Sequence, residues 1–198
     1  MRILIVGATG TIGRAVVEEL TPGNEIVRAS RKSSDVTVDI TNSESIRAMF
    51  ARVGKVDAIV SAAGSGAWKP LEELTDADFE LSLHDKLMGQ VNLVRTGFAF
   101  TNDDGSITVT SGILARSPTA GSAAISLINS GLEGFVRAAA LEAPRGIRVN
   151  VVSPPWVSET LEAMGMDVSQ GLPAAVVAGS YAQSVNTKVT GQVLEPER

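Results

Sequence analysis

Short runs of β-branched and other apolar residues alternate with longer amphipathic stretches along almost the whole chain. Short apolar runs bounded by turn residues predict strands, and apolar positions three and four residues apart predict helices. The predicted strands are residues 3–6, 25–29, 36–38, 58–60, 106–110, 148–152 and 191–194. The predicted helices are residues 12–20, 43–53, 76–98 and 122–142, and Thr75 is a candidate N-cap of the third.

This alternation predicts an α/β protein with a doubly wound parallel sheet, the Rossmann fold. Strands that alternate with helices pair in parallel through right-handed crossovers, so helices cover both faces of an open sheet. Several prolines and glycines interrupt the pattern after residue 152. We therefore expect a single domain over residues 1–198, in which residues 153–188 form a short irregular C-terminal cap at the substrate site.

The composition excludes several kinds of site and partner. The chain has no cysteine and one histidine, His84, so we expect no metal site. A net charge of -5 leaves no basic excess for binding nucleic acid or an anionic membrane. No apolar stretch approaches the roughly 20 residues that cross a bilayer. We expect a cytoplasmic protein whose partner is a small-molecule substrate.

A glycine-rich turn follows the first predicted strand and opens the first predicted helix. Glycines in such a turn let the backbone approach a diphosphate, and the helix N-terminus faces the phosphate charge. Because strand and helix lie where this mechanism needs them, the turn predicts a dinucleotide site. Its residues are Gly7, Thr9, Gly10, Thr11, Ile12 and Gly13. The alternative interpretation is an ordinary turn between a strand and a helix.

The end of the second predicted strand indicates which dinucleotide binds. An acidic residue there would bind the 2′-hydroxyl of the adenosine ribose and repel a 2′-phosphate. The sequence has Ser30, Arg31 and Lys32 instead, which supply a hydroxyl and two cations. This favours NADP(H), with NAD(H) kept as the alternative. In the other interpretation, Arg31 and Lys32 belong to a solvated surface loop.

Further short motifs follow the glycine turn in order along the chain. They are Asp39-Ile40, Ser61-Ala62-Ala63-Gly64, Thr110-Ser111-Gly112, Leu132-Glu133-Gly134, Gly146-Ile147-Arg148-Val149-Asn150, Ser153-Pro154 and Thr190-Gly191-Gln192-Val193-Leu194. Each motif alone is modest, but the series resembles the short-chain dehydrogenase/reductase superfamily over most of the chain. The resemblance implies a Rossmann fold that binds a nicotinamide dinucleotide.

The resemblance also implies roles for individual residues. It places Asp39 and Ile40 at the adenine, Ala62, Ala63 and Gly64 beside the adenosine ribose, and Pro154 and Val157 beside the nicotinamide. It makes Ser111 the active-site serine, which donates a hydrogen bond to a substrate oxygen. The alternative for Ser111 is a hydroxyl at the end of a strand that caps a loop.

The sequence departs from the superfamily at the residues that transfer the proton. The family pattern is a tyrosine followed four residues later by a lysine, whose cation lowers the pKa of the phenol. Ile125 and Asn129 occupy these positions here. Asn129 can still bind the ribose hydroxyls, but Ile125 cannot transfer a proton. Lys86 aligns with a family asparagine, so we expect it to supply positive charge or the proton near Ser111; the alternative is a surface lysine.

These residues predict an NADP(H)-dependent oxidoreductase with a rearranged active site. Its substrate would be an unidentified small carbonyl, alcohol or enone, and Trp156 either lines the substrate pocket or packs as an ordinary apolar residue. The alternative is a non-catalytic NADP(H)-binding sensor or regulatory module. Relatives associate through helices that correspond to residues 76–98 and 122–142, so we expect a homodimer or homotetramer.

Overall fold

The computed structural model describes residues 1–32 and 34–197. Its strands form one parallel sheet in the order β3-β2-β1-β4-β5-β6-β7. They are β1 (Arg2–Val6), β2 (Glu25–Ser30), β3 (Val36–Thr37), β4 (Val56–Ser61), β5 (Thr101–Thr110), β6 (Arg148–Val152) and β7 (Val193–Leu194). The strand order reverses between β1 and β4, and in open sheets the crevice at the carboxyl ends beside such a reversal binds ligands.

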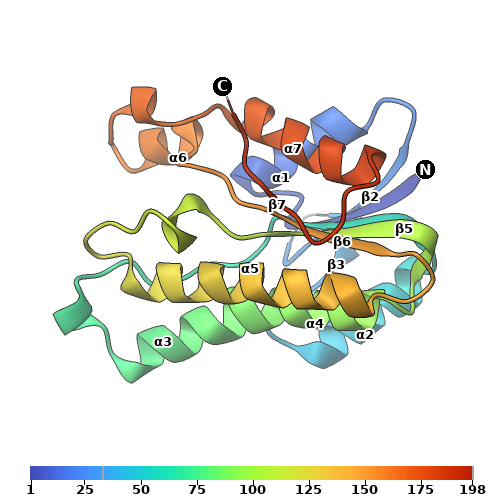
Figure 1. The fold of residues 1–198 in the computed structure, drawn as a ribbon, viewed down its shortest axis with the longest axis horizontal. Coiled ribbons are helices and arrows are strands. Elements are labelled where there is room, and N and C mark those ends of the chain that lie inside the picture. Colours follow the sequence, from blue (N-terminus) through green and yellow to red (C-terminus); the bar gives the residue numbers. More distant parts are fainter. Residues whose placement is uncertain (33, 198) are drawn as a thin grey trace.

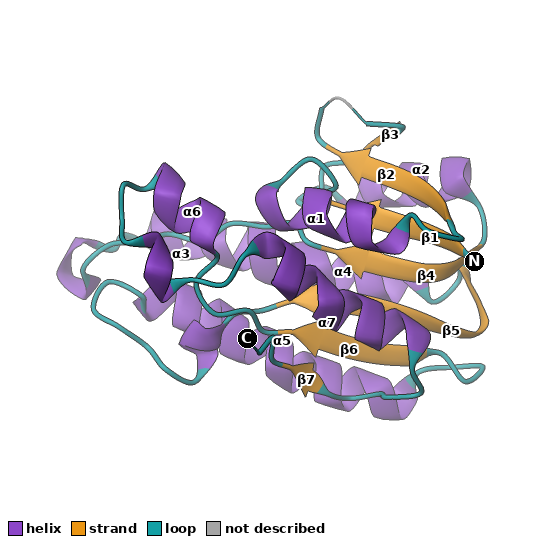
Figure 2. Ribbon diagram, turned by 90° about the horizontal axis from the view of Figure 1, so that it is seen from above, coloured by secondary structure: helices purple, strands orange, loops and turns teal. Residues whose placement is uncertain are grey.

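Helices cover both faces of the sheet (Figure 1). On one face lie α1 (Thr11–Leu20) and α7 (Ala174–Asn186), and on the other lie α2 (Ser43–Val53), α3 (Asp76–Ser82), α4 (Gly89–Gly97) and α5 (Ala123–Glu142). Helix α6 (Ser158–Ala163) lies beyond the carboxyl ends of the strands (Figure 2). Short 3-10 turns lie at Leu71–Glu73, Ile113–Ala115 and Val168–Gln170. Across the described residues, no helix combines the length and apolar character required to span a membrane.

Strand β1 shows why the apolar runs are continuous. Ile3 and Ile5 belong to the core cluster under α1 and α7, whereas Leu4 and Val6 belong to the cluster under α2, α4 and α5. All four side chains are buried. Successive side chains of a strand point to opposite faces, so a strand that is covered on both faces is apolar at every position. The predicted doubly wound sheet is therefore confirmed.

The predicted helix over residues 76–98 is interrupted by a π-helical segment, Leu83–Met88, between α3 and α4. Thr75 is the N-cap of α3, as expected, and forms a capping box with Asp78. Single π-helical turns inside α-helices often occur at functional sites. This one carries Lys86.

The prediction that residues 153–188 form an irregular cap was wrong for its second half. Residues 174–186 form α7, which packs against α1 and buries Tyr181. The Tyr181 hydroxyl forms a 2.6 Å hydrogen bond with the Thr110 hydroxyl. Helix α7 begins Ala-Ala-Val-Val-Ala-Gly-Ser, so small and apolar residues occupy most of its surface and the amphipathic period that identifies a helix is weak.

Candidate functional site

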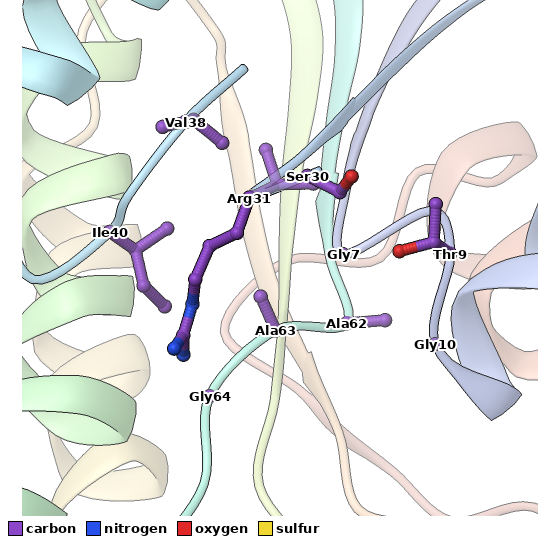
Figure 3. Close-up of a pocket in the computed structure, with 11 residues that line it drawn as sticks. Gly7, Thr9, Gly10, Ser30, Arg31, Val38, Ile40, Ala62, Ala63 and Gly64 are labelled. Carbon is purple, nitrogen blue, oxygen red and sulfur yellow. The ribbon is translucent and has the colours of Figure 1, made fainter. Parts of the chain in front are cut away.

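Two cavities lie at the carboxyl ends of the strands, one on each side of the strand reversal. The first, of about 220 Å³, is lined by Val6, Gly7, Thr9, Gly10, Ser30, Arg31, Val38, Ile40, Ala62, Ala63 and Gly64 (Figure 3). The second, of about 300 Å³, is lined by Ile12, Trp68, Lys86, Ser111, Gly112, Ile113, Leu114, Ile125, Asn129, Pro154, Pro155, Trp156, Val157, Thr160 and Met164. Helix α1 begins between them, with Gly10 in the first cavity and Ile12 in the second.

Two glycines let α1 begin in close contact with the strands. Gly7 has a φ of +83°, and a Cβ added to it would stand 2.7 Å from the carbonyl oxygen of Ala62. A Cβ at Gly13 would stand 2.0 Å from the carbonyl oxygen of Gly7. Both contacts are with backbone atoms that cannot move aside cheaply, so neither position accepts a side chain.

The N-terminus of α1 is open to an anion. Its N-cap is Gly10, no side chain caps the first turn, and that turn holds no acidic residue. Exposed N–H groups and the helix dipole favour a negative charge at this end of a helix. Since Thr9 and Gly10 line the first cavity, a diphosphate placed there meets no carboxylate from the first turn of α1.

Arg31 lies across the first cavity, with Ile40 on one side and Ala63 on the other (Figure 3). Its Nη2 atom is 3.2 Å from Oδ2 of Asp85, a carboxylate in the π-helical segment that is only 3% exposed. The Ser65 hydroxyl donates to the same oxygen at 2.7 Å. Asp85 therefore anchors one nitrogen of the guanidinium group while Arg31 lines the cavity.

Most of the remaining residues predicted for the dinucleotide line one of the two cavities. Ser30, Ile40, Ala62, Ala63 and Gly64 line the first cavity, and Ile12, Pro154 and Val157 line the second. Thr11, Gly13, Lys32 and Asp39 are not among the residues that line either one. The side chain of Asp39 accepts hydrogen bonds from the hydroxyl and backbone nitrogen of Thr41, which lower its pKa.

Lys86 extends from the π-helical segment into the second cavity. Its Nζ atom donates a hydrogen bond of 2.9 Å to the carbonyl oxygen of Ser111. Burial disfavours the charged form and lowers the pKa of the Lys86 ammonium group to about 8. At neutral pH the cavity therefore contains an ammonium group that loses its proton in mildly alkaline solution.

Ser111, which the sequence predicts as the active-site serine, lines the second cavity. Its side chain is 2% exposed and its hydroxyl donates a 3.0 Å hydrogen bond to Oε1 of Glu133 on α5. Side chains alternate along the end of β5: the Thr110 hydroxyl donates to the Ser61 carbonyl, and the next residue, Ser111, turns toward α5. The carbonyl group of Ser111 also accepts the hydrogen bond from Lys86.

Asn129 contributes a buried acceptor without a donor. The residue is 1% exposed, and its Nδ2 atom lies 3.4 Å from the carbonyl oxygen of Gly112. Its Oδ1 atom accepts no hydrogen bond from any described residue. A buried acceptor left unpaired is costly, and Asn129 lines the second cavity, so a hydroxyl of a bound ligand is a suitable donor.

Glu133 joins the ends of two strands behind the second cavity, a role that the sequence did not reveal. Its carboxylate accepts hydrogen bonds from the hydroxyls of Ser111 and Ser153, at 3.0 and 3.1 Å. Arg116 lies 3.5 Å from its other oxygen and 3.1 Å from Glu195, near the C-terminus. The sequence placed Glu133 only within the motif Leu132-Glu133-Gly134 and gave no sign of these partners.

Two further residues named from the sequence, Ile125 and Trp156, are found at the second cavity. Ile125 lines it, so an apolar side chain stands at the position of the family tyrosine. Tyr181 is fully buried, and this burial raises the pKa of its phenol. Trp156 does line the cavity, together with Trp68, which the sequence did not single out. Among the described residues, no group of three or more histidines or carboxylates is arranged to hold a metal ion.

The parallel sheet and the glycine turn define a Rossmann-type domain of the kind that binds dinucleotides. A family model described as "Enoyl-(Acyl carrier protein) reductase" matches residues 11–191. The chain therefore belongs to the short-chain dehydrogenase/reductase family of oxidoreductases.

Individual relatives agree with this assignment. Sepiapterin reductase of Chlorobaculum tepidum is 26% identical over 232 residues, covering 98% of this chain and 95% of that protein. The crystal structure of the protein lin1944 from Listeria innocua is 43% identical, covers 100% of both chains and has a TM-score of 0.95. A small-chain dehydrogenase crystallised in complex with NADPH shares the fold, with a TM-score of 0.88 and 23% identity over 98% of this chain and 95% of that one.

Proposed function

We propose that this protein is an NADP(H)-dependent oxidoreductase in which Lys86 replaces the family tyrosine as the source of positive charge or of the proton. Its substrate is a small carbonyl, alcohol or enone. The observation that carries the proposal is the Lys86 ammonium group inside the second cavity, with its Nζ atom 2.9 Å from the Ser111 carbonyl oxygen.

The residues of both cavities fit a nicotinamide dinucleotide. The N-terminus of α1 would bind the diphosphate, and the unpaired Oδ1 atom of Asn129 would accept a hydrogen bond from a ribose hydroxyl. When bound, the reduced dinucleotide supplies the hydride, and the protein supplies orientation and charge. The NADPH bound to one structural neighbour supports NADP(H) as the form used here.

Arg31 would select the phosphorylated dinucleotide. Asp85 engages one nitrogen of its guanidinium group and so holds Arg31 over the cavity. The other N–H groups of Arg31 remain for the 2′-phosphate, which a guanidinium group binds well.

Lys86 would stabilise the negative charge that develops on the substrate oxygen. An ammonium group has three N–H donors, and the Ser111 carbonyl accepts from one of them. The other two can reach an oxygen in the cavity. A lysine whose pKa lies near 8 can also give up its proton, which a general acid has to do.

We expect the Arg31→Ala substitution to weaken NADPH binding by about 10- to 150-fold, because one charge-assisted hydrogen bond contributes roughly 1.5–3 kcal/mol. NADH binding should change by less than about twofold, because NADH lacks the 2′-phosphate. The chain has two tryptophans, both at the second cavity, so energy transfer from indole to bound NADPH reports binding.

The control is Arg52→Ala, which removes an exposed arginine at the end of α2 and should leave both affinities unchanged. Equal losses of NADPH and NADH affinity in Arg31→Ala would contradict the assignment of Arg31 to the 2′-phosphate. Failure of the unmodified protein to bind either dinucleotide would contradict the proposed function itself.

A second candidate function follows from Ile125. With an isoleucine in place of the family phenol, the site could bind NADP(H) and report its presence to a partner without turnover. The oxidoreductase and the sensor predict different results in a screen of ketones and enones with NADPH. Tight NADPH binding without oxidation of NADPH by any of these compounds would favour the sensor.

A further inference from the structure

Two tryptophans face each other at the second cavity. Trp68 lies in the loop that follows β4, and Trp156 lies in the loop that follows β6. Their ring centroids are 5.3 Å apart and their planes meet at 62°, an edge-to-face pair. This geometry is favourable for aromatic rings and leaves parts of both indoles free for a third ring.

The backbone around Trp68 holds its indole in place. The backbone nitrogen of Lys69 donates a 3.1 Å hydrogen bond to the carbonyl oxygen of Gly121. A Cβ at Gly121 would stand 3.2 Å from Nε1 of Trp68, so this loop is packed closely on the indole. Although Trp68 is 39% exposed, its ring packs against both Trp156 and the loop of Gly121.

The charge on the rest of the cavity wall disfavours a cationic ligand. Most of the lining side chains are apolar, and Lys86 is the only charged residue among the described residues that line the cavity. Indoles bind cations readily, but the Lys86 ammonium group repels a cationic ligand. An uncharged ring with one acceptor oxygen satisfies both the indoles and the ammonium group.

We infer that the second cavity binds an uncharged aromatic ketone, with its ring against Trp68 and Trp156 and its carbonyl oxygen toward Lys86. This inference rests on the proposed function, since the substrate must share the cavity with the nicotinamide ring that Pro154 and Val157 border. A cavity of about 300 Å³ that holds both rings restricts the substrate to one or two fused rings.

A matched pair of ketones tests the inference. 1-Tetralone and 1-decalone have the same carbon skeleton and carbonyl position, but only 1-tetralone has an aromatic ring. Calorimetric titration is done on the protein saturated with NADP+, which cannot donate a hydride. We expect 1-tetralone to bind about 3–10 times more tightly than 1-decalone, the contribution of one favourable aromatic contact.

Two variants of Trp156 test the indole itself. Trp156→Leu should remove the preference for 1-tetralone over 1-decalone, and Trp156→Phe, which keeps an aromatic face, should retain most of it. The preference persisting in Trp156→Leu would overturn the inference, as would equal binding of the two ketones to the unmodified protein. Tighter binding of 1-naphthoate than of 1-tetralone would also overturn it, because the cavity would then select an anion.

A direct titration with NADP+ precedes the ketones, so that failure of the proposed function can be told apart from failure of this inference. If NADP+ does not bind, the proposed function fails, and the inference that rests on it falls at that step. If NADP+ binds but the ketones show no aromatic preference, the ring inference fails and the dinucleotide assignment is unaffected.

Discussion

Replacing Lys86 with methionine is expected to lower the turnover number for reduction by about 10²–10⁴-fold, the usual contribution of a general acid or of a charge in a closed site. Methionine is similar in length but cannot hold a charge or give up a proton. The measurement is NADPH oxidation under saturating conditions, with the ketone or enone that reacts fastest in the unmodified protein.

The pH dependence distinguishes a chemical role of Lys86 from a packing role. Burial lowers the pKa of Lys86 to about 8, so the ammonium form predominates below that pH. The rate of reduction should therefore be constant at neutral pH and fall as the pH rises through about 8. The reverse oxidation, which needs the neutral amine, should rise over the same interval. In Lys86→Met both changes should disappear.

Lys188→Met is the matched control, because Lys188 is an exposed lysine outside both cavities. It should leave the turnover number and its pH profile unchanged. A turnover number in Lys86→Met within about threefold of the unmodified protein would show that Lys86 contributes little of the 10²–10⁴-fold expected from a general acid. An unchanged decline in rate near pH 8 would assign that ionisation to another group.

The Glu133→Ala substitution is expected to cause a large loss in the free energy of unfolding. Removal of the carboxylate leaves the buried hydroxyls of Ser111 and Ser153 without their acceptor and Arg116 without one of its two carboxylates. Loss of one partner of a buried charge typically costs roughly 3–5 kcal/mol. Because Arg116 is 35% exposed and keeps Glu195, we expect about 3 kcal/mol, the lower end of that range.

Urea unfolding of Glu133→Ala and of the unmodified protein measures the difference in their free energies of unfolding. Glu133→Gln keeps one acceptor oxygen, so it should lose less than Glu133→Ala. Glu142→Ala, which removes an exposed glutamate at the end of the same helix, should change the free energy of unfolding by less than about 0.5 kcal/mol. If Glu133→Ala lowered the free energy of unfolding by less than about 1 kcal/mol, water would be replacing the carboxylate. The hydrogen bonds of Glu133 to Ser111 and Ser153 would then not stabilise the strand ends.

The sequence by itself predicted the doubly wound sheet and the glycine turn. Both depend on local rules: apolar runs make strands, and the strand, turn and helix of the dinucleotide site are contiguous in residues 2–20. The positions of Lys86 and Asn129 at a common cavity were also anticipated, through alignment with a family pattern. Helix α7 was missed because its small apolar residues give a weak amphipathic period.

Only the tertiary structure decided what the buried polar side chains do. The sequence could not orient the Ser111 hydroxyl, because its direction depends on which face of β5 each residue presents and on Glu133, 22 residues away. Nor could it pair Arg31 with Asp85, which is 54 residues distant along the chain. A buried charge or hydroxyl takes whatever partner the packing brings within hydrogen-bond distance, and that partner is set by the assembled fold rather than by neighbours along the chain.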